Sequence, residues 1–299
     1  MSEENGPIIS MNSLCKRYGE KIILDNISFK IMNGEIVGLL GRNGAGKTTI
    51  LKSILGVKSY DKGDILYNNV SLKGRPDLVS EFGTLIESSF LDYVTAEENI
   101  RLLIMASGRF NKNEINTNID RAFKLVGLEN DKKLRVNQYS FGMKKRLGLV
   151  QAILFGKQFM MLDEPFVGLD PIGKDIIKRE IVNKAKNENG CVLFSSHDLE
   201  DVEEICDRVI MIDNGKCIYN GPVTKDKIYD FKIVKFNDEI RKMMLYNFRN
   251  ITISKQNIIS INEEELNNVL NYIFINNMKI SDLSIGTSSL IKLFKETEK

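Results

Sequence analysis

A glycine-rich stretch of the chain is suited to holding a nucleoside triphosphate. Residues 41–48 have the pattern G-x-x-x-x-G-K-T, follow a short apolar run at 35–40 and lead into an apolar helical pattern. Such a loop turns backbone N–H groups toward polyphosphate, and the N-terminus of the following helix adds partial positive charge. Lys47 is expected to reach the β- and γ-phosphates, and Thr48 to bind Mg²⁺. The nucleotide-binding residues expected in this stretch are Gly41, Asn43, Gly44, Gly46, Lys47, Thr48 and Thr49.

Two adjacent carboxylates follow a second apolar run and would serve the same triphosphate. Asp163 and Glu164 come directly after residues 159–162, which have the composition of a buried strand. A buried carboxylate is costly unless a cation or hydrogen-bond donors meet it. Asp163 is therefore expected to bind the nucleotide's Mg²⁺ through water and the Thr48 hydroxyl, and Glu164 to orient the attacking water. The alternative is an acidic turn before Pro165, which the phosphate loop upstream makes less favoured.

His197, the only histidine of the chain, follows a third apolar run at residues 191–194. A single histidine is often structural, but ligands of open α/β sheets bind at the carboxyl ends of the strands. His197 would then lie at the same sheet edge as Lys47 and the two carboxylates. From there its ring is expected to hydrogen-bond the γ-phosphate and hold the attacking water. The convergence on one edge favours a nucleotide site more strongly than any single motif does.

The elements that must position these residues alternate between strands and helices. Residues 7–40 predict β structure with a hairpin turn at Asn33-Gly34. Helices are predicted from residue 95, where Thr95-Ala96-Glu97-Glu98 forms a capping box. Buried strands that alternate with a helix after residue 155 indicate a largely parallel sheet. The predicted fold class is α/β: a P-loop NTPase core over residues 7–222, with an antiparallel β subdomain and a helical subdomain at about 90–155.

A smaller module is predicted at the C-terminus. Residues 228–299 have the element order βαββαβ, which is that of a small ferredoxin-like α+β domain, followed by a helix from about Ser288 to Glu298. The module contains no catalytic constellation, so we expect an accessory role for it.

A fourth stretch, Ser140-Phe141-Gly142-Met143, opens a predicted helix with a Ser and a Gly. This is a second candidate anion-binding N-terminus, although taken alone it is equally well a plain N-cap. Together with the other motifs, in this order, it makes residues 7–222 resemble the ATP-binding subunit of an ABC transporter. The matching motifs are the phosphate loop, this signature stretch, Asp163-Glu164, the loop Gly168-Leu169-Asp170 and the switch histidine His197.

The resemblance implies partners and site residues that the motifs alone do not. Two ATP-binding subunits, either two copies of this chain or this chain and a homologue, would pack head to tail. Each ATP would lie between one subunit's phosphate loop and the partner's signature, so that Ser140 and Gly142 bind the ATP of the other subunit. Asp170 would communicate across the dimer, and Tyr18 would stack on adenine, although a strand tyrosine is commonly only packing.

The sequence departs from the family pattern in two places. The signature usually has Ser-Gly-Gly-Gln, whereas Phe141 and Met143 stand at its second and last positions. Glu87 stands where most relatives carry a glutamine that meets the metal, so the expected metal ligands are Thr48, Glu87 and Asp163. The sequence around Glu87 resembles the corresponding segment of exporters that protect bacteria from bacitracin or lantibiotics.

Composition limits the remaining classes. The formal net charge of +2 gives no indication of a nucleic-acid partner, and 42% hydrophobic and 27% charged residues are typical of a soluble globular protein. No apolar run approaches the roughly 18–20 residues that span a bilayer, and the polar N-terminus predicts no signal peptide. The four cysteines form no C-x-x-C pair, which favours reduced thiols in a cytoplasm.

The leading hypothesis is therefore a cytoplasmic ATPase that uses ATP and Mg²⁺ and is held at the inner face of the cell membrane by separate transmembrane permease subunits. It would drive the export of antimicrobial peptides or antibiotics and so give resistance. Arg101 and Leu102 would help to receive the permease. One alternative is a soluble ABC-type ATPase of translation or DNA repair, which normally has two nucleotide domains or long insertions. The other is a P-loop kinase or GTPase, which has no need of the signature stretch.

Overall fold

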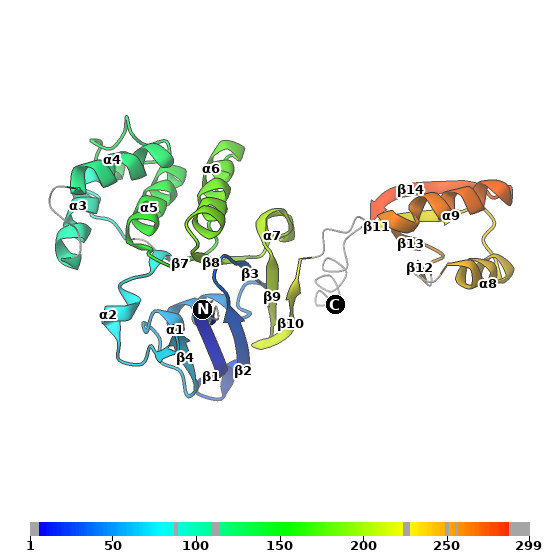
Figure 1. The fold of residues 1–299 in the computed structure, drawn as a ribbon, viewed down its shortest axis with the longest axis horizontal. Helices are drawn as coiled ribbons and strands as arrows, with labels where there is room; N and C mark the ends of the chain where they lie inside the picture. Colours follow the sequence, from blue (N-terminus) through cyan, green and yellow to red (C-terminus); the bar gives the residue numbers. More distant parts are fainter. Residues whose placement is uncertain are drawn as a thin grey trace, which may run out of the picture. The chain divides into compact units, whose positions relative to one another are not determined.

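The computed structural model describes residues 6–86, 89–108, 114–223, 228–248, 251–254 and 256–286. The chain divides into two compact units, Met1–Pro222 and Val223–Lys299, which are described separately (Figure 1). Among the described residues, no helix combines the length and the apolar composition that crossing a lipid bilayer requires.

The first unit is built on a six-stranded sheet. Its strands lie in the order β10 (Lys216–Pro222), β9 (Arg208–Asp213), β3 (Ile36–Leu40), β8 (Cys191–Ser196), β7 (Phe159–Leu162) and β6 (Gly83–Leu85). All neighbours pair in parallel except β9 and β10, which form a hairpin at the edge. Every residue of β3, β7 and β8 is buried, because helices and a second sheet cover the two faces. The prediction of a largely parallel sheet is confirmed.

A four-stranded antiparallel sheet packs on one face of this first sheet. Its order is β2 (Lys21–Ile31), β1 (Ile9–Tyr18), β4 (Lys62–Tyr67) and β5 (Val70–Ser71). Helix α1 (Lys47–Ile54) lies between the two sheets, and its Ile50, Leu51 and Ile54 share one apolar core with side chains of both. The core therefore anchors the helix that begins at the phosphate loop.

The predicted hairpin at Asn33-Gly34 is wrong. Gly34 does form a turn, with φ at 74°, but β2 and β3 belong to different sheets. All five residues of β3 are buried and apolar or glycine, so this strand takes a central position where β8 and β9 pair on its two sides. The Asn-Gly turn predicts the change of chain direction but not the pairing of the strands on its two sides. Here the burial of every β3 residue places that strand in the centre of the other sheet.

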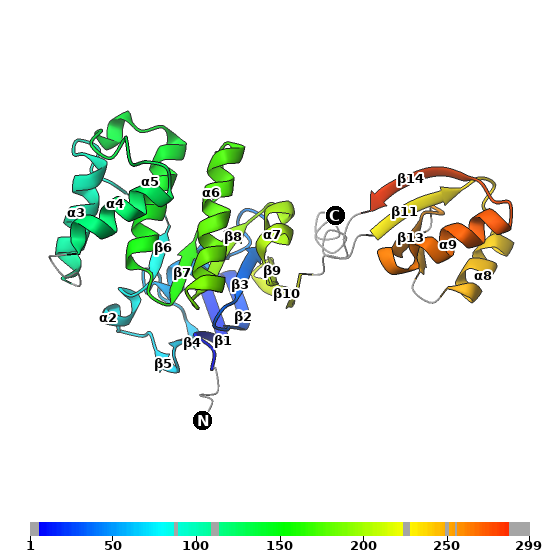
Figure 2. The same ribbon diagram turned by 45° about the horizontal axis from the view of Figure 1, so that its top comes forward.

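Helices cover the other face of the six-stranded sheet (Figures 1 and 2). They are α5 (Phe141–Phe155), α6 (Pro171–Val182) and α7 (Leu199–Ile205), and α3 (Ala96–Ser107) and α4 (Ile115–Leu125) pack on α5. The short helix α2 (Pro76–Val79) lies instead on the side of the antiparallel sheet, where Leu78 and Val79 pack against the core between the two sheets. Two further short helical segments are η1 (Val136–Gln138) and η2 (Asn183–Asn187). The capping box predicted at Thr95 is confirmed, since Thr95 and Glu98 exchange side-chain-to-backbone hydrogen bonds. Helices α3 to α5 thus form the helical part, and α5 carries the signature stretch at its start.

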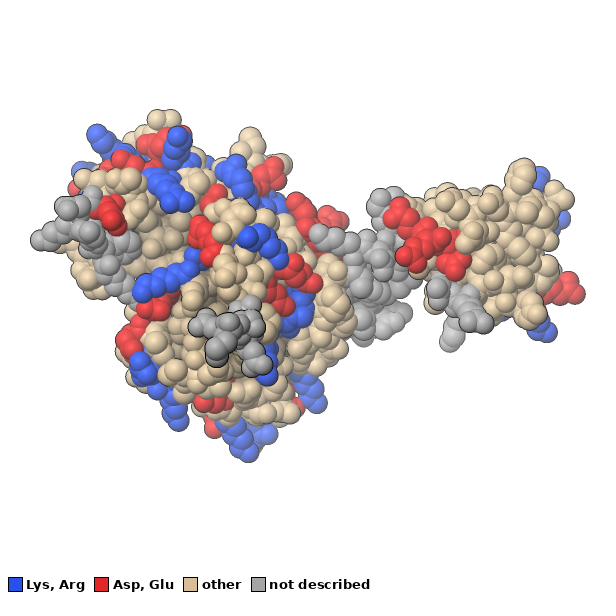
Figure 3. Space-filling model, viewed as in Figure 1, with Lys and Arg blue, Asp and Glu red and all other residues tan. Residues whose placement is uncertain are grey.

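Surface charge of both signs is mixed on the first unit. On the face that Figure 3 shows, Lys and Arg side chains of the described residues alternate with Asp and Glu side chains. Binding to the phosphate backbone of a nucleic acid requires a broad basic surface. On this face, the described residues form no such surface.

The second unit contains a four-stranded antiparallel sheet and two helices. Its elements are β11 (Ile228–Ile233), α8 (Asp238–Asn247), β12 (Ile251–Ile253), β13 (Ile259–Asn262), α9 (Glu263–Ile275) and β14 (Ile280–Gly286). The strand order β12-β13-β11-β14 is that of the ferredoxin-like fold. Phe231, Met244 and Val269 bring strand and helices together in one small core. The helix predicted from about Ser288 to Glu298 lies outside the described residues.

Candidate ATP hydrolysis site

The phosphate loop connects β3 to α1 and depends on glycine at two points. A Cβ at Gly41 would lie 2.4 Å from the carbonyl oxygen of Ile212, and Gly46 has φ at 115° directly before α1. At Gly41 a side chain would clash with this oxygen, and at Gly46 a residue with a Cβ would rarely adopt this backbone angle. Both positions therefore favour glycine. Lys47, the first residue of α1, is 5% exposed, and its Nζ donates to the carbonyl oxygens of Gly41 and Arg42. The ammonium therefore faces the inside of its own loop, where phosphate oxygens would bind.

Asp163 and Thr48 meet across this loop. Thr48 Oγ1 lies 3.2 Å from Asp163 Oδ2 and donates to it. Asp163 directly follows β7, and Thr48 is the second residue of α1. A hydroxyl and a carboxylate oxygen at this spacing are hard oxygen donors, which fits the ligand preference of Mg²⁺.

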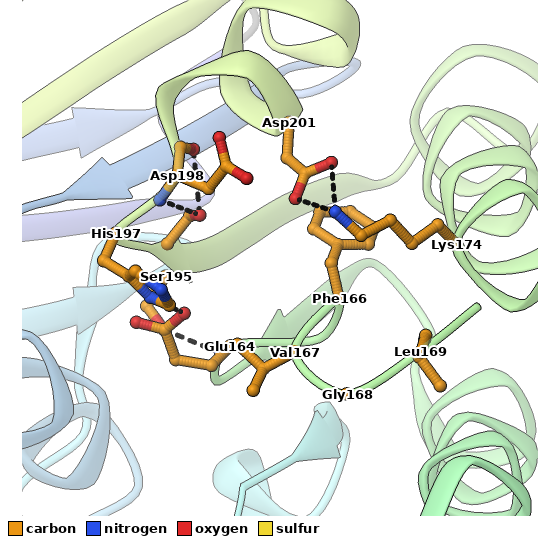
Figure 4. Close-up of a pocket in the computed structure, with 11 residues that line it drawn as sticks. Glu164, Phe166, Val167, Gly168, Leu169, Lys174, Ser195, His197, Asp198 and Asp201 are labelled. Atoms are coloured by element: carbon orange, nitrogen blue, oxygen red, sulfur yellow. Dashed lines mark hydrogen bonds and ion pairs between the residues drawn. The ribbon is translucent and has the colours of Figure 1, made fainter. Parts of the chain in front are cut away.

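Glu164 stands at the centre of the site. Its Oε2 lies 2.8 Å from His197 Nδ1, and its Oε1 lies 3.3 Å from Lys47 Nζ. Figure 4 shows the carboxylate pointing toward the His197 ring at the edge of a cavity of about 260 Å³. Three side chains that follow three different strands thus converge on one edge of the sheet. Apart from its ion pair with Lys47, buried Oε1 accepts no hydrogen bond from the described residues. It could accept one from water once Lys47 turns away from it toward phosphate oxygens.

Ser195 contacts both acidic residues of the site and was not among the predicted site residues. Its hydroxyl donates to Asp163 Oδ1 and accepts the backbone N–H of Glu164 at 2.8 Å. Ser195 is fully buried in β8. Two hydroxyls, Ser195 and Ser196, end a buried and otherwise apolar strand directly before His197, and they were the available signal, because a buried polar group needs partners.

The expected adenine contact lies beside the phosphate loop. Tyr18, at the end of β1, lines a cavity of about 320 Å³ together with the loop residues Asn43, Gly44, Gly46, Lys47, Thr48 and Thr49. The residue is 48% exposed, and the ammonium groups of Lys16 and Lys58 lie 5.1 Å and 5.2 Å from the centre of its ring. A base that stacks on this ring would have to displace at least one of these lysines.

The signature stretch is not part of that cavity. Ser140 is the N-cap of α5 and accepts the N–H of Met143 at 3.2 Å. Neither Ser140 nor Gly142 is among the described residues that line the cavity around the phosphate loop. Helix α5 therefore presents its N-terminus elsewhere than at the chain's own triphosphate site.

Two further expected residues have distinct positions. Asp170 is the N-cap of α6, where its Oδ1 accepts the N–H of Gly173 at 2.9 Å. Glu87 lies outside the described residues, so its role as a metal ligand stays a prediction.

Comparison with known proteins identifies the group to which this site belongs. The ABC transporter family matches residues 24–167, which contain the phosphate loop, the signature stretch and both carboxylates. A bacitracin transport ATP-binding protein of Bacillus licheniformis is 35% identical over 231 residues, 77% of this chain and 74% of the relative. The chain belongs to the ATP-binding subunits of ABC transporters.

Other relatives place this ABC subunit in the group that the sequence resembled. A lantibiotic transport ATP-binding protein of Streptococcus pyogenes is 32% identical over 76% of this chain and 98% of the relative. The resemblance to ATP-binding proteins of bacitracin and lantibiotic transport is confirmed, and family membership makes the chain an ATPase.

Solved structures agree with this ABC fold. The structure of an ATP-binding subunit of an ABC transporter superposes with a TM-score of 0.67 at 28% identity, covering 72% of this chain and 90% of that one. A dimeric ATP-binding cassette bound to ADP and Pi superposes with a TM-score of 0.66 at 21% identity, covering 72% and 99%. The predicted fold class is confirmed.

Proposed function

We propose that this chain hydrolyses Mg·ATP at a site shared by two subunits and thereby powers a membrane exporter of antimicrobial peptides or antibiotics. The observation that carries the proposal is the arrangement of Glu164 between His197 and Lys47 above the phosphate loop. It supplies a general base, a γ-phosphate contact and a phosphate-binding cation at one point.

The nucleotide contacts follow from the cavity. The loop from Gly41 to Thr49 would bind the phosphates through its N–H groups and Lys47, and Tyr18 would carry the adenine. Thr48 and Asp163 would hold Mg²⁺ with Glu87, and the metal would supply charge neutralisation between the β- and γ-phosphates.

The chain's own residues do the proton and positioning work. Glu164 accepts a hydrogen bond from the attacking water through Oε1 and takes its proton as the water oxygen bonds to the γ-phosphorus. The bond from the γ-phosphorus to the bridging oxygen breaks at the same time, so that ADP leaves with that oxygen and phosphate is released. In its doubly protonated form His197 donates from Nδ1 to the other carboxylate oxygen and from Nε2 toward the γ-phosphate. Lys47 shifts from the loop carbonyls and Glu164 to the phosphates, since its ammonium then pairs with greater negative charge.

A second subunit completes the site. Ser140 and Gly142 stand outside their own nucleotide cavity, and a Ser-capped helix N-terminus with free N–H groups suits a γ-phosphate. A head-to-tail dimer would bring this N-terminus to the partner's ATP, and Asp170 would lie at the contact between the two. The dimeric cassette among the fold's neighbours is consistent with this arrangement.

Permease subunits would dock on the helical part. Helix α3 exposes Leu102 at 46% and Met105 at 75%, and Arg101 beside them is paired with Glu97 at 2.6 Å. Exposed apolar side chains with a charged neighbour form a surface that suits a protein partner. The subunit would thus sit in the cytoplasm against the inner face of the membrane.

The substrate class is proposed from Glu87 and from the relatives, which are named for bacitracin and lantibiotic transport. Cells that lack this chain should become more sensitive to such peptides, and resistance should return when the wild-type gene is restored. A growth-inhibition panel of bacitracin and lantibiotics tests this. Unchanged inhibition across the whole panel would contradict the proposed substrate class without affecting the ATPase site.

The catalytic proposal is tested with Glu164→Gln. The amide keeps the shape of the side chain but cannot take a proton, so kcat for ATP hydrolysis should fall about 100-fold or more while ATP binding stays within about threefold. Phosphate release and the binding of a fluorescent ATP analogue are the measurements. Wild-type turnover in this variant would contradict the role of Glu164.

A further inference from the structure

A lysine of the signature helix reaches the backbone of the catalytic turn. Lys145 lies in α5, two residues after the signature stretch, and its Nζ donates to the carbonyl oxygen of Glu164. The two residues come from different elements and are 19 positions apart in the chain. The contact therefore joins the helix that would bind the partner's ATP to the residue that would activate water at the chain's own ATP.

Glu164 needs such support because of its backbone conformation. Its φ is 46°, in the left-handed region that residues with a Cβ rarely occupy. Such a conformation persists where surrounding contacts enforce it. The Glu164 N–H donates to Ser195 Oγ at 2.8 Å, and its carbonyl accepts from Lys145 and, at 3.4 Å, from the N–H of Val167. The peptide units on the two sides of Glu164 are thus each held by a side chain from outside the turn, Ser195 on one side and Lys145 on the other.

The surroundings of Lys145 differ from those of its neighbour on the helix. Burial lowers the pKa of Lys145, while the charges of Glu164 and Asp163 act to raise it. Its Nζ also lies 5.8 Å from the centre of the Phe141 ring in the signature stretch. Lys144, by contrast, points to the surface and pairs with Asp92 at 2.9 Å. Only the second of the two lysines is directed at the catalytic turn.

We propose that Lys145 is a positioning residue that holds the Glu164 turn in its active conformation and couples the signature helix to the catalytic carboxylate of the same chain. A displacement of α5 when its N-terminus engages the partner's nucleotide then moves the Glu164 carbonyl through Lys145. The proposal rests on the role of Glu164 given above, because Lys145 does not touch the reacting atoms.

The first test is the steady-state ATPase activity of the full chain with Lys145→Met. The thioether keeps the length of the side chain but cannot donate, so kcat should fall about tenfold or more while KM for ATP changes less than about threefold. Lys145→Arg keeps a donor and should recover to within about threefold of wild type. The matched control Lys144→Met removes a surface lysine of the same helix and should leave kcat unchanged. Wild-type kcat in Lys145→Met would overturn the proposal.

The second test asks whether Lys145 acts through Glu164. Residual hydrolysis is measured in single turnovers for Glu164→Gln and for the double variant with Lys145→Met. Residues that act as a unit are non-additive, so the double variant should lose less than about twofold relative to Glu164→Gln. The double variant could instead lose activity relative to Glu164→Gln by the same factor that Lys145→Met loses relative to wild type. Lys145 would then act separately from Glu164, through a structural effect, and the proposal would be overturned.

Two outcomes separate the possible failures. Wild-type turnover in Glu164→Gln would contradict the catalytic role of Glu164 and, with it, the role of Lys145. An inactive Glu164→Gln beside a normal Lys145→Met would contradict the positioning role alone. If Lys145→Met unfolds below the assay temperature, Lys145→Gln, which keeps a shorter donor, takes its place in both tests and should show an intermediate kcat.

Discussion

At the scale of single residues, the site depends on groups that fix the two carboxylates. Asp163 and Glu164 are adjacent in the chain, yet one faces Thr48 and the other faces His197. The Ser195 hydroxyl makes this divergence possible because it binds the Asp163 carboxylate and the Glu164 N–H together. One oxygen thereby contacts both the proposed metal-binding group and the proposed general base.

Ser195→Ala should lower kcat for ATP hydrolysis by about 10- to 100-fold. The substitution leaves the buried Glu164 N–H without its acceptor, a loss of about 1–3 kcal/mol in the alignment of the catalytic turn. The measurement is steady-state phosphate release at saturating ATP. Ser196→Ala is the matched control, because the Ser196 hydroxyl bonds to Asp198 instead of the carboxylates, and its kcat should stay near that of wild type. Equal effects of the two substitutions would contradict the prediction.

A buried carboxylate away from the site predicts a pH effect on stability. Glu180 on α6 is 4% exposed, and burial raises its pKa although Arg179 at 3.6 Å opposes the shift. A raised folded-state pKa means that the stability is fully present below the unfolded pKa, about 4.3, and is lost as pH rises through the folded pKa. Glu180→Gln removes this loss.

The melting temperature of Glu180→Gln relative to wild type should therefore increase with pH. The difference should be smallest at about pH 4.5 and largest at about pH 7.5, because the buried carboxyl costs stability only above its unfolded pKa. Thermal unfolding followed by circular dichroism at a series of pH values measures it. A difference that is constant over this range would contradict the linkage.

At the scale of elements, helix α5 and the loop after β7 are packed through an aromatic ring. A Cβ built on Gly168 would lie 2.5 Å from Phe141 Cε1, and Gly168 has φ at 75°. Phe141 stands where the usual signature has glycine, so the ring and Gly168 depend on each other. The packing holds the start of the signature helix against the loop that ends at Asp170.

Gly168→Ala should lower the free energy of unfolding by about 1–3 kcal/mol, through the unfavourable φ and the contact with the ring. In the double variant with Phe141→Gly the contact with the ring is gone, while the unfavourable φ at position 168 remains. The double variant should thus lose less than the sum of the two single variants. Chemical denaturation of the three variants measures the coupling, and strict additivity would show that the ring does not limit position 168.

At the scale of the whole molecule, the proposed function gives one chain two halves of different sites. Ser140 and Gly142 begin α5 outside the cavity of Lys47 and Thr48, so in this proposal a second subunit completes the triphosphate site. Because hydrolysis would reopen the pair, a subunit that binds ATP without hydrolysing it should stay associated.

Glu164→Gln with ATP should therefore elute as a dimer in size-exclusion chromatography with light scattering, and as a monomer without nucleotide. Adding Ser140→Arg places a long side chain at the partner's γ-phosphate and should abolish the dimer, while the ATP affinity of the monomer changes less than about threefold. As a control, Lys144→Met in the Glu164→Gln background should still dimerise. A persistent dimer with Ser140→Arg would contradict the shared site.

Much of this site follows from the sequence because its parts are local. A G-x-x-x-x-G-K-T loop between strand and helix, and carboxylates directly after a buried apolar run, have the same chemistry in any parallel sheet. The βαββαβ order of the C-terminal unit likewise follows from short-range patterns. Long-range pairing was less accessible, since Asn33-Gly34 predicted a hairpin where β3 instead entered the centre of another sheet.

The sequence by itself determined which chemical groups the chain carries and that parallel strands would bring Lys47, Glu164 and His197 to one edge. Only the tertiary structure decided how those groups are held. The left-handed backbone of Glu164, its support by Ser195 and Lys145, and the exclusion of Ser140 from its own cavity are contacts between distant segments. Such contacts depend on the packing of α5, β7 and β8 against one another, and residue spacing along the chain does not record that packing.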